Sequence, residues 1–391
     1  FDEDAYTGEL LERLSDLDRA FTTTAADKRS AALGLLDATV KPFGGGPYRL
    51  VEVTDDGTWV LRANKNHTRS VAKIDRLEIR IERDPSVATT RLLSGEADWV
   101  LELGPQEAEI IADAPGYRVA PRALDTQWGV LFNLRPDRLY FDVRARRAFA
   151  MCIDHEGLAT ALDEQRPIAG TPYNAESWAE PDWQLPERDV AAANALLDEA
   201  GWQMAVDGVR QRDGVRLSST IAVRPTAVDL FTFANAAAEQ LLECGIELLV
   251  EELDLTGATM LDQLQYPNDF DTLLWQRTLS TDPDSAVRVF ESSRITDKEN
   301  EADENPSGFT SEIVDFLVAS ARASDDPDER MEAYAGVQDE LESLLPYWPL
   351  WYASSMSAVS ERLSDSDGLL DPGRPRYAWD ISDWELARDG G

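Results

Sequence analysis

Apolar and polar positions recur at two spacings along the chain. Residues 48–53 and 58–62 alternate around a turn at residues 55–57, a pattern typical of a β-hairpin. Apolar positions at helical spacing then begin after Asp84 and end at Gly95, with a capping side chain and a proline at the start. Strand and helix patterns alternate in this way along most of the sequence, which predicts an α/β fold.

The same spacings predict the elements that follow. Expected strands cover residues 74–81, 97–101, 128–132, 215–223, 246–251 and 270–275. Expected helices cover residues 142–162, 190–200, 228–244, 311–321 and 327–344, and two more lie within residues 2–40. The character of the chain changes near Asn133, and a length of 391 residues is typical of two domains or more.

Acidic residues outnumber basic ones two to one. The chain has 74 Asp and Glu against 37 Lys and Arg, which gives a formal net charge of −37. Nucleic acids and anionic membrane surfaces repel such a chain, so neither is an expected partner. Hydrophobic residues make up 43% of the sequence, which is enough to build cores. Lysine is rare, and we interpret the acidity as a halophilic adaptation in which salt screens self-repulsion.

Few residues offer catalytic or metal-binding chemistry. The only histidines are His67 and His155, too few for an imidazole cluster, and we expect His155 on the solvated face of a helix. Cys152 and Cys244 lie among apolar helical positions, and we interpret them as buried thiols. The sequence has no phosphate-binding glycine loop, so no cofactor and no metal are expected. A carboxylate pair for glycoside hydrolysis stays an alternative, because such a pair needs no other signature.

Six aromatic residues stand at strand ends or in segments that connect the two halves of the chain: Trp128, Trp178, Trp275, Trp348, Trp351 and Tyr352. Large aromatic side chains at such places either fill a core or line a cleft between domains, where flat rings bind small ligands. Both interpretations stay open at this point.

Several short motifs occur in an order that one protein family shares. They lie at residues 46–50 (GPYRL), 74–81 (IDRLEIRI), 92–98 (LLSGEAD), 141–150 (FDVRARRAFA) and 345–350 (LPYWPL). From residue 42 to about 355, the chain thereby resembles the family 5 extracellular solute-binding proteins, which are the oligopeptide, dipeptide and nickel binders of ABC importers.

The resemblance implies a two-lobed, periplasmic-binding-protein-like α/β fold of type II, cluster C like, with a hinge between the lobes. Lobe I would comprise residues 42–126 plus 351–391, and lobe II residues 127–350. Residues 1–41 would be a helical remnant of an N-terminal part that is absent or reduced, since the family has a larger segment before the motif at residue 46.

The same resemblance implies a ligand-binding site between the lobes. The residues expected to bind ligand there are Trp128, Trp178, Trp275, Arg277, Leu279, Trp348 and Tyr352. Aligning Asp282 on the family's Asp-Pro pair places Leu279 where peptide binders have an aspartate for the ligand's α-amino group. A buried ammonium without that carboxylate is costly, which argues against peptide binding by the usual route. Trp128 and Trp275 suit stacking on a sugar, and Arg277 suits an anionic group.

The predicted function is therefore that of the extracytoplasmic substrate-binding component of an ABC importer. It would capture a small solute, such as a peptide, a sugar or a chelate, by hinge closure and then dock on the membrane permease subunits. No catalytic residue is expected, and the protein would be anchored to the membrane through a segment outside this chain. Two alternatives are a ligand-sensing or regulatory module with the same fold and the glycoside hydrolase mentioned above.

Overall fold

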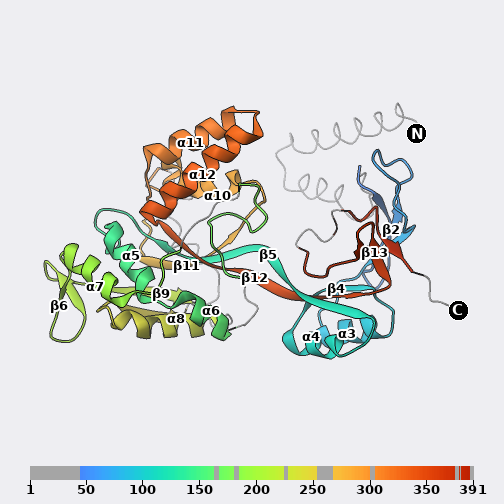
Figure 1. The fold of residues 1–391 in the computed structure, drawn as a ribbon, viewed down its shortest axis with the longest axis horizontal. Helices are drawn as coiled ribbons and strands as arrows, with labels where there is room; N and C mark the ends of the chain where they lie inside the picture. Colours follow the sequence, from blue (N-terminus) through green and yellow to red (C-terminus); the bar gives the residue numbers. More distant parts are fainter. Residues whose placement is uncertain are drawn as a thin grey trace, which may run out of the picture. The chain divides into compact units, whose positions relative to one another are not determined.

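The described part of the protein forms two compact units (Figure 1). The computed structural model describes residues 45–162, 167–179, 185–223, 228–252, 267–299, 304–374, 378 and 380–387. Unit 1 comprises Phe1–Arg122 and Ser355–Gly391, and unit 2 comprises Ala123–Ser354. Strands β5 (Tyr117–Phe132) and β12 (Tyr347–Ser360) each continue from one unit into the other. The helices expected within residues 2–40 lie outside the described residues.

Unit 1 contains a three-stranded antiparallel sheet, two helices and a small C-terminal sheet. The first sheet consists of β1 (Tyr48–Val53), β2 (Trp59–Ala63) and β3 (Arg76–Ile79). The Asp84 side chain accepts the Ser86 N–H and starts the first helix, as the sequence predicts. The remaining elements are α3 (Pro85–Leu93), β4 (Trp99–Leu103), α4 (Pro105–Ala112), β13 (Leu363–Asp365), β14 (Gly368–Leu369) and β15 (Glu385–Leu386).

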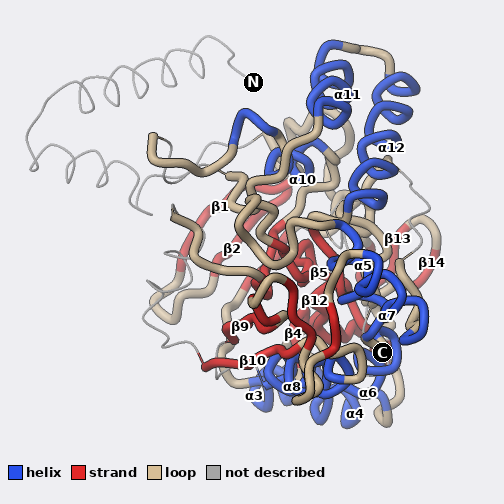
Figure 2. Tube along the Cα trace, turned by 90° about the vertical axis from the view of Figure 1, so that its left-hand side faces the viewer, coloured by secondary structure: helices blue, strands red, loops and turns tan. Residues whose placement is uncertain are grey.

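Unit 2 is organised around the strands β11 (Thr272–Thr278), β5 and β12, which lie in that order in one sheet. A parallel pair, β9 (Ser218–Val223) and β10 (Glu247–Glu252), lies beside the connecting helix α8 (Val228–Leu242) (Figure 2). The other elements are α5 (Val143–Cys152), α6 (His155–Leu162), α7 (Val190–Glu199), β6 (Gln203–Met204), β7 (Arg210–Arg212), β8 (Val215–Arg216), α10 (Asp284–Val287), η1 (Arg288–Phe290), η2 (Ser292–Arg294), α11 (Glu312–Ala323) and α12 (Pro327–Leu344).

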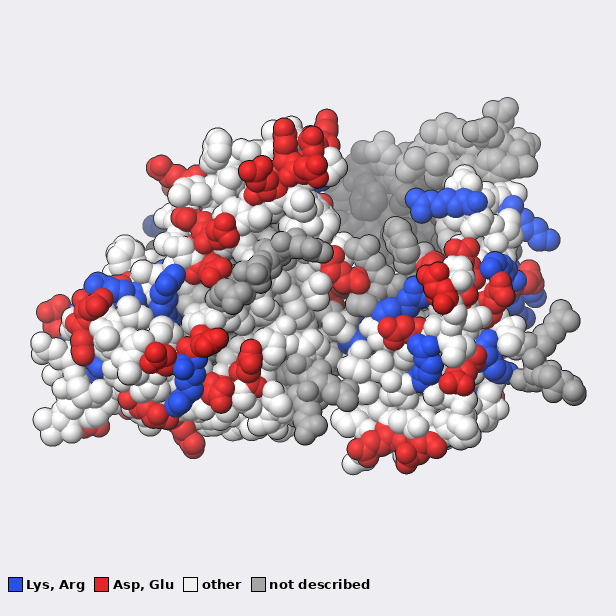
Figure 3. Space-filling view, viewed as in Figure 1, with Lys and Arg blue, Asp and Glu red and all other residues white. Residues whose placement is uncertain are grey.

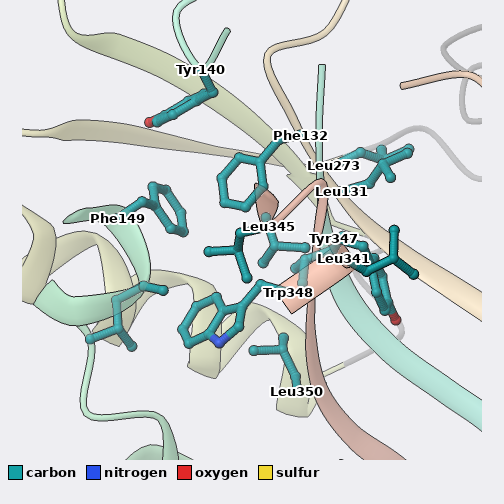
Figure 4. Packing of buried hydrophobic residues seen from close by; sticks show 14 of the residues in the cluster. Leu131, Phe132, Tyr140, Phe149, Leu273, Leu341, Leu345, Tyr347, Trp348 and Leu350 are labelled. Atoms are coloured by element: carbon teal, nitrogen blue, oxygen red, sulfur yellow. The ribbon is translucent and has the colours of Figure 1, made fainter. Parts of the chain in front are cut away.

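The hydrophobic core of unit 2 joins these strands to the helices α5, α7, α8 and α12. Trp348 of β12 is fully buried in it, with its ring centroid 6.3 Å from that of Phe149 and 5.4 Å from that of His155. Figure 4 shows Phe149 and Leu350 beside the indole, and Tyr347 directed away from it. Neighbouring residues of one strand thus face different surroundings, as strand geometry requires.

The helix predicted over residues 142–162 is in fact two helices. α5 ends at Cys152, because Ile153 has an extended backbone with ψ near 129°. The Asp154 carboxylate then accepts the Gly157 N–H at 3.0 Å and caps α6. A Cβ at Gly157 would lie 2.2 Å from an Asp154 oxygen, so a glycine makes room for this cap.

His155 is buried, and the expectation of a solvated helix face is wrong. The residue is 5% exposed, and its Nε2 lies 2.7 Å from the Leu350 carbonyl oxygen. Because the helix breaks at Ile153, the side chain of the first residue of α6 points in a different direction from the one it would have in a continuous helix. Burial lowers the pKa of His155 to about 4, so the ring is neutral at pH 7.

The interpretation of Cys152 and Cys244 as free thiols is also wrong. The two fully buried residues form a disulfide, with their Cα atoms 6.4 Å apart. They stand 92 residues apart in sequence, at the end of α5 and just after α8, so no local pattern revealed the pair. Disulfides persist mainly in oxidising compartments, which agrees with a location outside the cytoplasm.

Charged side chains are spread over the visible face of both units (Figure 3). Carboxylates gather where α12 begins, with Asp326 as its N-cap and Asp328 and Glu329 in its first turn. Acidic groups at a helix N-terminus are favourable because they face the positive end of the helix dipole. Among the described residues, no helix is both long and apolar enough to cross a membrane.

Candidate functional site

Polar and aromatic side chains gather on one face of the central strands of unit 2. Arg277 on β11 lies directly opposite Gln127 on β5, and Trp275 lies opposite Gly129. Side chains two residues apart on a strand point to the same face, so Trp275, Arg277 and Gln127 share it. We define the Arg277 cluster as Gln127, Trp275, Arg277, Phe290 and Tyr347.

The Arg277 guanidinium is buried among three aromatic rings. The residue is 5% exposed, and its Cζ lies 5.1 Å from the centroid of the Tyr347 ring. The centroids of the Trp275 and Phe290 rings each lie 5.4 Å from the same atom. Aromatic faces attract cations, more strongly where water is excluded. The rings therefore stabilise the positive charge inside the protein.

Arg277 makes few hydrogen bonds for a buried guanidinium. Its Nη1 donates to the Pro172 carbonyl at 3.3 Å, and its Nη2 donates to the Ala286 carbonyl. Among the described residues, no carboxylate forms an ion pair with it. Burial lowers the pKa of Arg277, while the nearby Tyr347 hydroxyl acts in the opposite direction. Arginine nevertheless stays charged at neutral pH, so the cluster carries a positive charge.

Tyr347 reaches the cluster because a glycine lies beneath its ring. A Cβ at Gly129 would lie 2.2 Å from the Tyr347 Cζ and 2.3 Å from its hydroxyl oxygen. Glycine within a strand commonly marks such a close approach. The Tyr347 hydroxyl is buried beside the Arg277 guanidinium and interacts with it. Burial raises the pKa of Tyr347, and the Arg277 charge lowers it in part, so the phenol keeps its proton.

Gln127 anchors the loop of residues 167–179 to the strands. Its Nε2 donates to the Thr171 carbonyl at 2.8 Å and to the Tyr173 carbonyl at 3.3 Å. The Tyr352 hydroxyl donates to the same Tyr173 carbonyl at 2.8 Å. The Gln127 Oε1 has no hydrogen-bond partner among the described residues. The loop therefore uses the donor of this amide and leaves its acceptor unused.

The predicted ligand-binding residues lie in different surroundings. Trp275 and Arg277 belong to the Arg277 cluster, whereas Leu279 and Trp348 lie in the hydrophobic core. The Leu279 N–H donates to the Asp125 carbonyl at 2.7 Å, which fixes the strand end. Trp128 lies opposite Gln276, one residue out of register with Trp275, so the two indoles occupy opposite faces of the sheet.

A pocket of about 490 Å³ is lined by residues of α10, α11 and α12, and Trp178 lies near it. The Trp178 ring centroid is 5.0 Å from the Arg330 Cζ and 5.6 Å from that of Tyr334, both in the lining. Arg322 pairs with Asp284 at 2.6 Å, and Arg330 pairs with Asp282 at 3.4 Å. These side chains form ion pairs with one another, and the pairs hold the three helices together. In the described part of the chain, no group of three or more His, Cys, Asp or Glu is placed to hold a metal ion.

Sequence reasoning missed Gln127, Phe290 and Tyr347. Tyr347 lies within the motif at residues 345–350, but only its neighbour Trp348 and the following Trp351 and Tyr352 were chosen as candidates. Gln127 is a polar residue just before a strongly apolar run, a signal that was available. Phe290 ends η1, which follows α10 directly, and no pattern in the sequence indicates that this turn brings the ring to the site.

Comparison with known families shows which family this chain belongs to. Residues 20–297 match the family described as bacterial extracellular solute-binding proteins, family 5 Middle. The chain belongs to this family. The match covers most of the chain and includes the β5 and β11 residues of the Arg277 cluster. The family predicted from the sequence motifs is thereby confirmed.

Curated relatives of this solute-binding chain are distant in sequence. Protein XP55 of Streptomyces lividans is 26% identical over 357 residues, which cover 91% of this chain and 64% of that protein. Di/tripeptide-binding protein 3 of Pseudomonas aeruginosa is 22% identical over 331 residues, which cover 83% of this chain and 59% of that protein. The chain thus spans about three fifths of the length of these relatives.

Solved structures confirm the predicted periplasmic-binding-protein-like α/β fold. NikZ from Campylobacter jejuni in complex with Ni(L-His) aligns with a TM-score of 0.65 at 23% identity, covering 88% of this chain and 69% of that one. The oligopeptide-binding protein AppA from Bacillus subtilis in complex with a nonapeptide aligns with a TM-score of 0.61 at 22% identity, covering 88% and 66%. At such identities the likeness concerns the fold alone.

Proposed function

We propose that this chain is the extracytoplasmic substrate-binding component of an ABC importer and that it captures a peptide-like or other small solute. The family match over residues 20–297 carries the proposal. The buried Cys152–Cys244 disulfide supports an oxidising compartment outside the cytoplasm. The proposed protein binds without catalysis and is held at the membrane next to the permease subunits.

In the proposed mechanism, the two units act as lobes that close on the solute. β5 and β12 are the strands that bend, because each of them continues from one unit into the other. A solute shifts the balance toward the closed form only by its higher affinity for that form, about 5.5 kcal/mol for a nearly complete switch. The permease then recognises the closed form.

The proposed roles of the predicted residues follow from their surroundings. Trp275 and Arg277 would contact the solute, and the partly buried Trp128 and Trp178 would offer ring surface to other parts of it. The buried Leu279, Trp348 and Tyr352 would hold the strands behind the site in place.

The test is native mass spectrometry of protein purified in molar KCl, combined with small-angle X-ray scattering. We expect a co-purified small molecule and a radius of gyration that decreases when the solute is added back to stripped protein. A solute recovered with unchanged mass agrees with binding, whereas its turnover would favour the glycoside hydrolase alternative. No co-purified solute, together with no thermal shift from peptides, sugars or nickel–histidine, would contradict the proposal.

A further inference from the structure

A short turn in unit 1 carries the only acceptor triplet for N-glycosylation in the sequence. Residues 66–68 read Asn-His-Thr and follow the pattern Asn-X-Ser/Thr, in which X is not proline. Residues 305–307 read Asn-Pro-Ser, but proline stands at the centre and Asn305 is fully buried. A single triplet also arises by chance in chains of this length, so the surroundings of Asn66 decide what the match means.

Asn66 stands at the third position of a β-turn that follows β2. The turn comprises residues 64–67 and is closed by the His67 N–H, which donates to the Asn64 carbonyl at 3.0 Å. The Asn64 Oδ1 accepts the Asn66 N–H at 3.2 Å, and the Asn64 Nδ2 donates to the Gly46 carbonyl at 3.0 Å. The side chain of Asn64 therefore anchors the turn to the segment before β1, and the side chain of Asn66 takes no part in this.

The two side chains that the acceptor triplet requires are exposed and free. Within the described ranges, neither the Asn66 amide nor the Thr68 hydroxyl forms a hydrogen bond. Asn66 differs in this from the other asparagines that the structure describes, because a side-chain hydrogen bond holds each of them. These are Asn64, Asn133, Asn174, Asn194, Asn235, Asn268 and Asn305. A bulky group can therefore be attached to the Asn66 amide without the loss of a contact in the fold.

The turn lies in a basic stretch of this acidic chain. Residues 62–80 contain six Lys and Arg against two Asp and Glu, a formal net charge of +4, whereas the whole chain has −37. Four of the six basic residues form ion pairs with carboxylates. Lys65 and Arg69, which flank the triplet, form none among the described residues. An anionic reactant that the rest of the surface repels is therefore attracted to this turn.

We infer that Asn66 is an N-glycosylation site at which the protein carries an oligosaccharide. The co-reactant is an oligosaccharide esterified to a lipid phosphate, and a transferase of the membrane catalyses the step. The Asn66 Nδ2 forms a bond to C1 of the first sugar and loses one proton. The bond from C1 to the phosphate oxygen breaks, and the lipid phosphate leaves with its electron pair, so nothing is oxidised or reduced. The inference shares with the proposed function only the location outside the cytoplasm, which the buried disulfide supports.

Mass spectrometry of the protein isolated from its natural host tests the site. A protease that cuts before aspartate releases residues 56–74, which contain the whole triplet. We expect this peptide to be heavier than its sequence by the mass of an oligosaccharide. Its fragment spectrum should contain sugar ions and should place the added mass on Asn66. The peptide that contains Asn305 should have its unmodified mass, because that asparagine is buried and precedes a proline.

Variants expressed in the same host separate the triplet from its surroundings. Asn66→Gln and Thr68→Ala should each abolish the added mass, whereas Thr68→Ser should keep it, because serine retains the hydroxyl. Asn235→Gln is the matched control, since it changes an exposed asparagine that belongs to no acceptor triplet, and its 56–74 peptide should keep the oligosaccharide. Circular dichroism shows whether each variant is folded.

Cell fractionation separates the glycosylation site from the importer proposal. A folded protein found outside the cytoplasm whose 56–74 peptide has its unmodified mass overturns the site, as does an oligosaccharide that persists in Asn66→Gln. In both cases the importer proposal stands. A protein that carries the oligosaccharide on Asn66 but neither retains a solute nor closes supports the site and contradicts the importer proposal. An unmodified protein found only in the cytoplasm contradicts both.

Discussion

The two sides of strand β12 bury aromatic residues in opposite ways. On one side, Trp348 lies in continuous apolar packing against Phe149, within the core that also contains the disulfide. On the other side, Tyr347 lies against a guanidinium whose donors the protein only partly satisfies. The first arrangement maximises stability, since buried apolar contacts are favourable without further partners. The second gives up stability at one place, which is typical of binding sites.

The difference predicts that stability and binding respond to different residues. Changes on the Trp348 side should alter the free energy of unfolding and leave the affinity for the co-purified solute intact. Changes on the Tyr347 side should alter that affinity. Each prediction below breaks or sharpens this separation, beginning with the largest expected effect.

Removal of the disulfide should give the largest loss of stability. Replacing Cys152 and Cys244 together by alanine frees a loop closed over 92 residues, and we expect the free energy of unfolding to fall by about 4–5 kcal/mol. Urea unfolding followed by circular dichroism measures the loss. The affinity for the co-purified solute, measured well below the unfolding transition, should stay unchanged, and weaker binding would contradict the separation of the two sides.

Acid should destabilise the Trp348 side through His155. Its pKa is lowered by burial to about 4 in the folded protein and is ordinarily 6.5, so between these values the unfolded chain takes up a proton that the folded one does not. Stability is therefore retained above pH 6.5 and falls by up to about 1.4 kcal/mol per pH unit as the pH decreases toward 4. We expect urea unfolding of wild-type protein to follow this slope.

The variant His155→Gln isolates the contribution of this residue. Glutamine can still donate to the Leu350 carbonyl but does not titrate, so the difference between the two proteins should change between pH 7 and pH 5. Parallel unfolding curves over that range would mean that His155 does not sense pH.

The cluster on the Tyr347 side should respond to Gly129. The variant Gly129→Ala places a methyl group where the Tyr347 ring lies, and overpacking of this kind costs about 1–3 kcal/mol. The displaced ring should also weaken binding of the co-purified solute, because Tyr347 packs on Arg277. Gly170→Ala is the matched control, because nothing lies within 4 Å of its Cβ position. Equal affinities of both variants for the co-purified solute would show that Tyr347 has no part in binding.

Sequence patterns predicted most elements of this fold but not how they meet. Local signals marked α3, α7, α11 and α12, because capping residues and apolar spacing act within a few residues. They missed α4 and the short hairpin of β6 and β7, and they showed only the C-terminal end of the 16-residue strand β5. The middle of β5 lacks the apolar run that made residues 128–132 recognisable.

In the candidate site, it is even clearer that local patterns do not predict which distant residues meet. Trp275 was found because it ends a recognisable apolar run, and Arg277 because it lies in the segment before Asp282 that resembles the family, whereas Gln127 became relevant only through its register with Arg277. The pairing of Cys152 with Cys244 likewise depends on the packing of α5 against α8, which no spacing in the sequence encodes. Contacts between distant residues decide such features, and a single sequence does not state them.

Salt concentration should have the smallest effect on the free energy of unfolding. It should also distinguish the exposed charges from the buried charge of Arg277. The net charge of −37 resides largely on exposed carboxylates, and ions screen their repulsion over distances of about 3 Å at 1 M. We therefore expect the free energy of unfolding to rise on the order of 1 kcal/mol between 0.5 and 2 M KCl. Arg277 is buried, where screening is weak, so the affinity for the co-purified solute should change less than tenfold over the same range. A flat unfolding free energy would contradict the halophilic interpretation, and solute binding that disappears at 2 M KCl would mean that the solute is held by exposed charges instead.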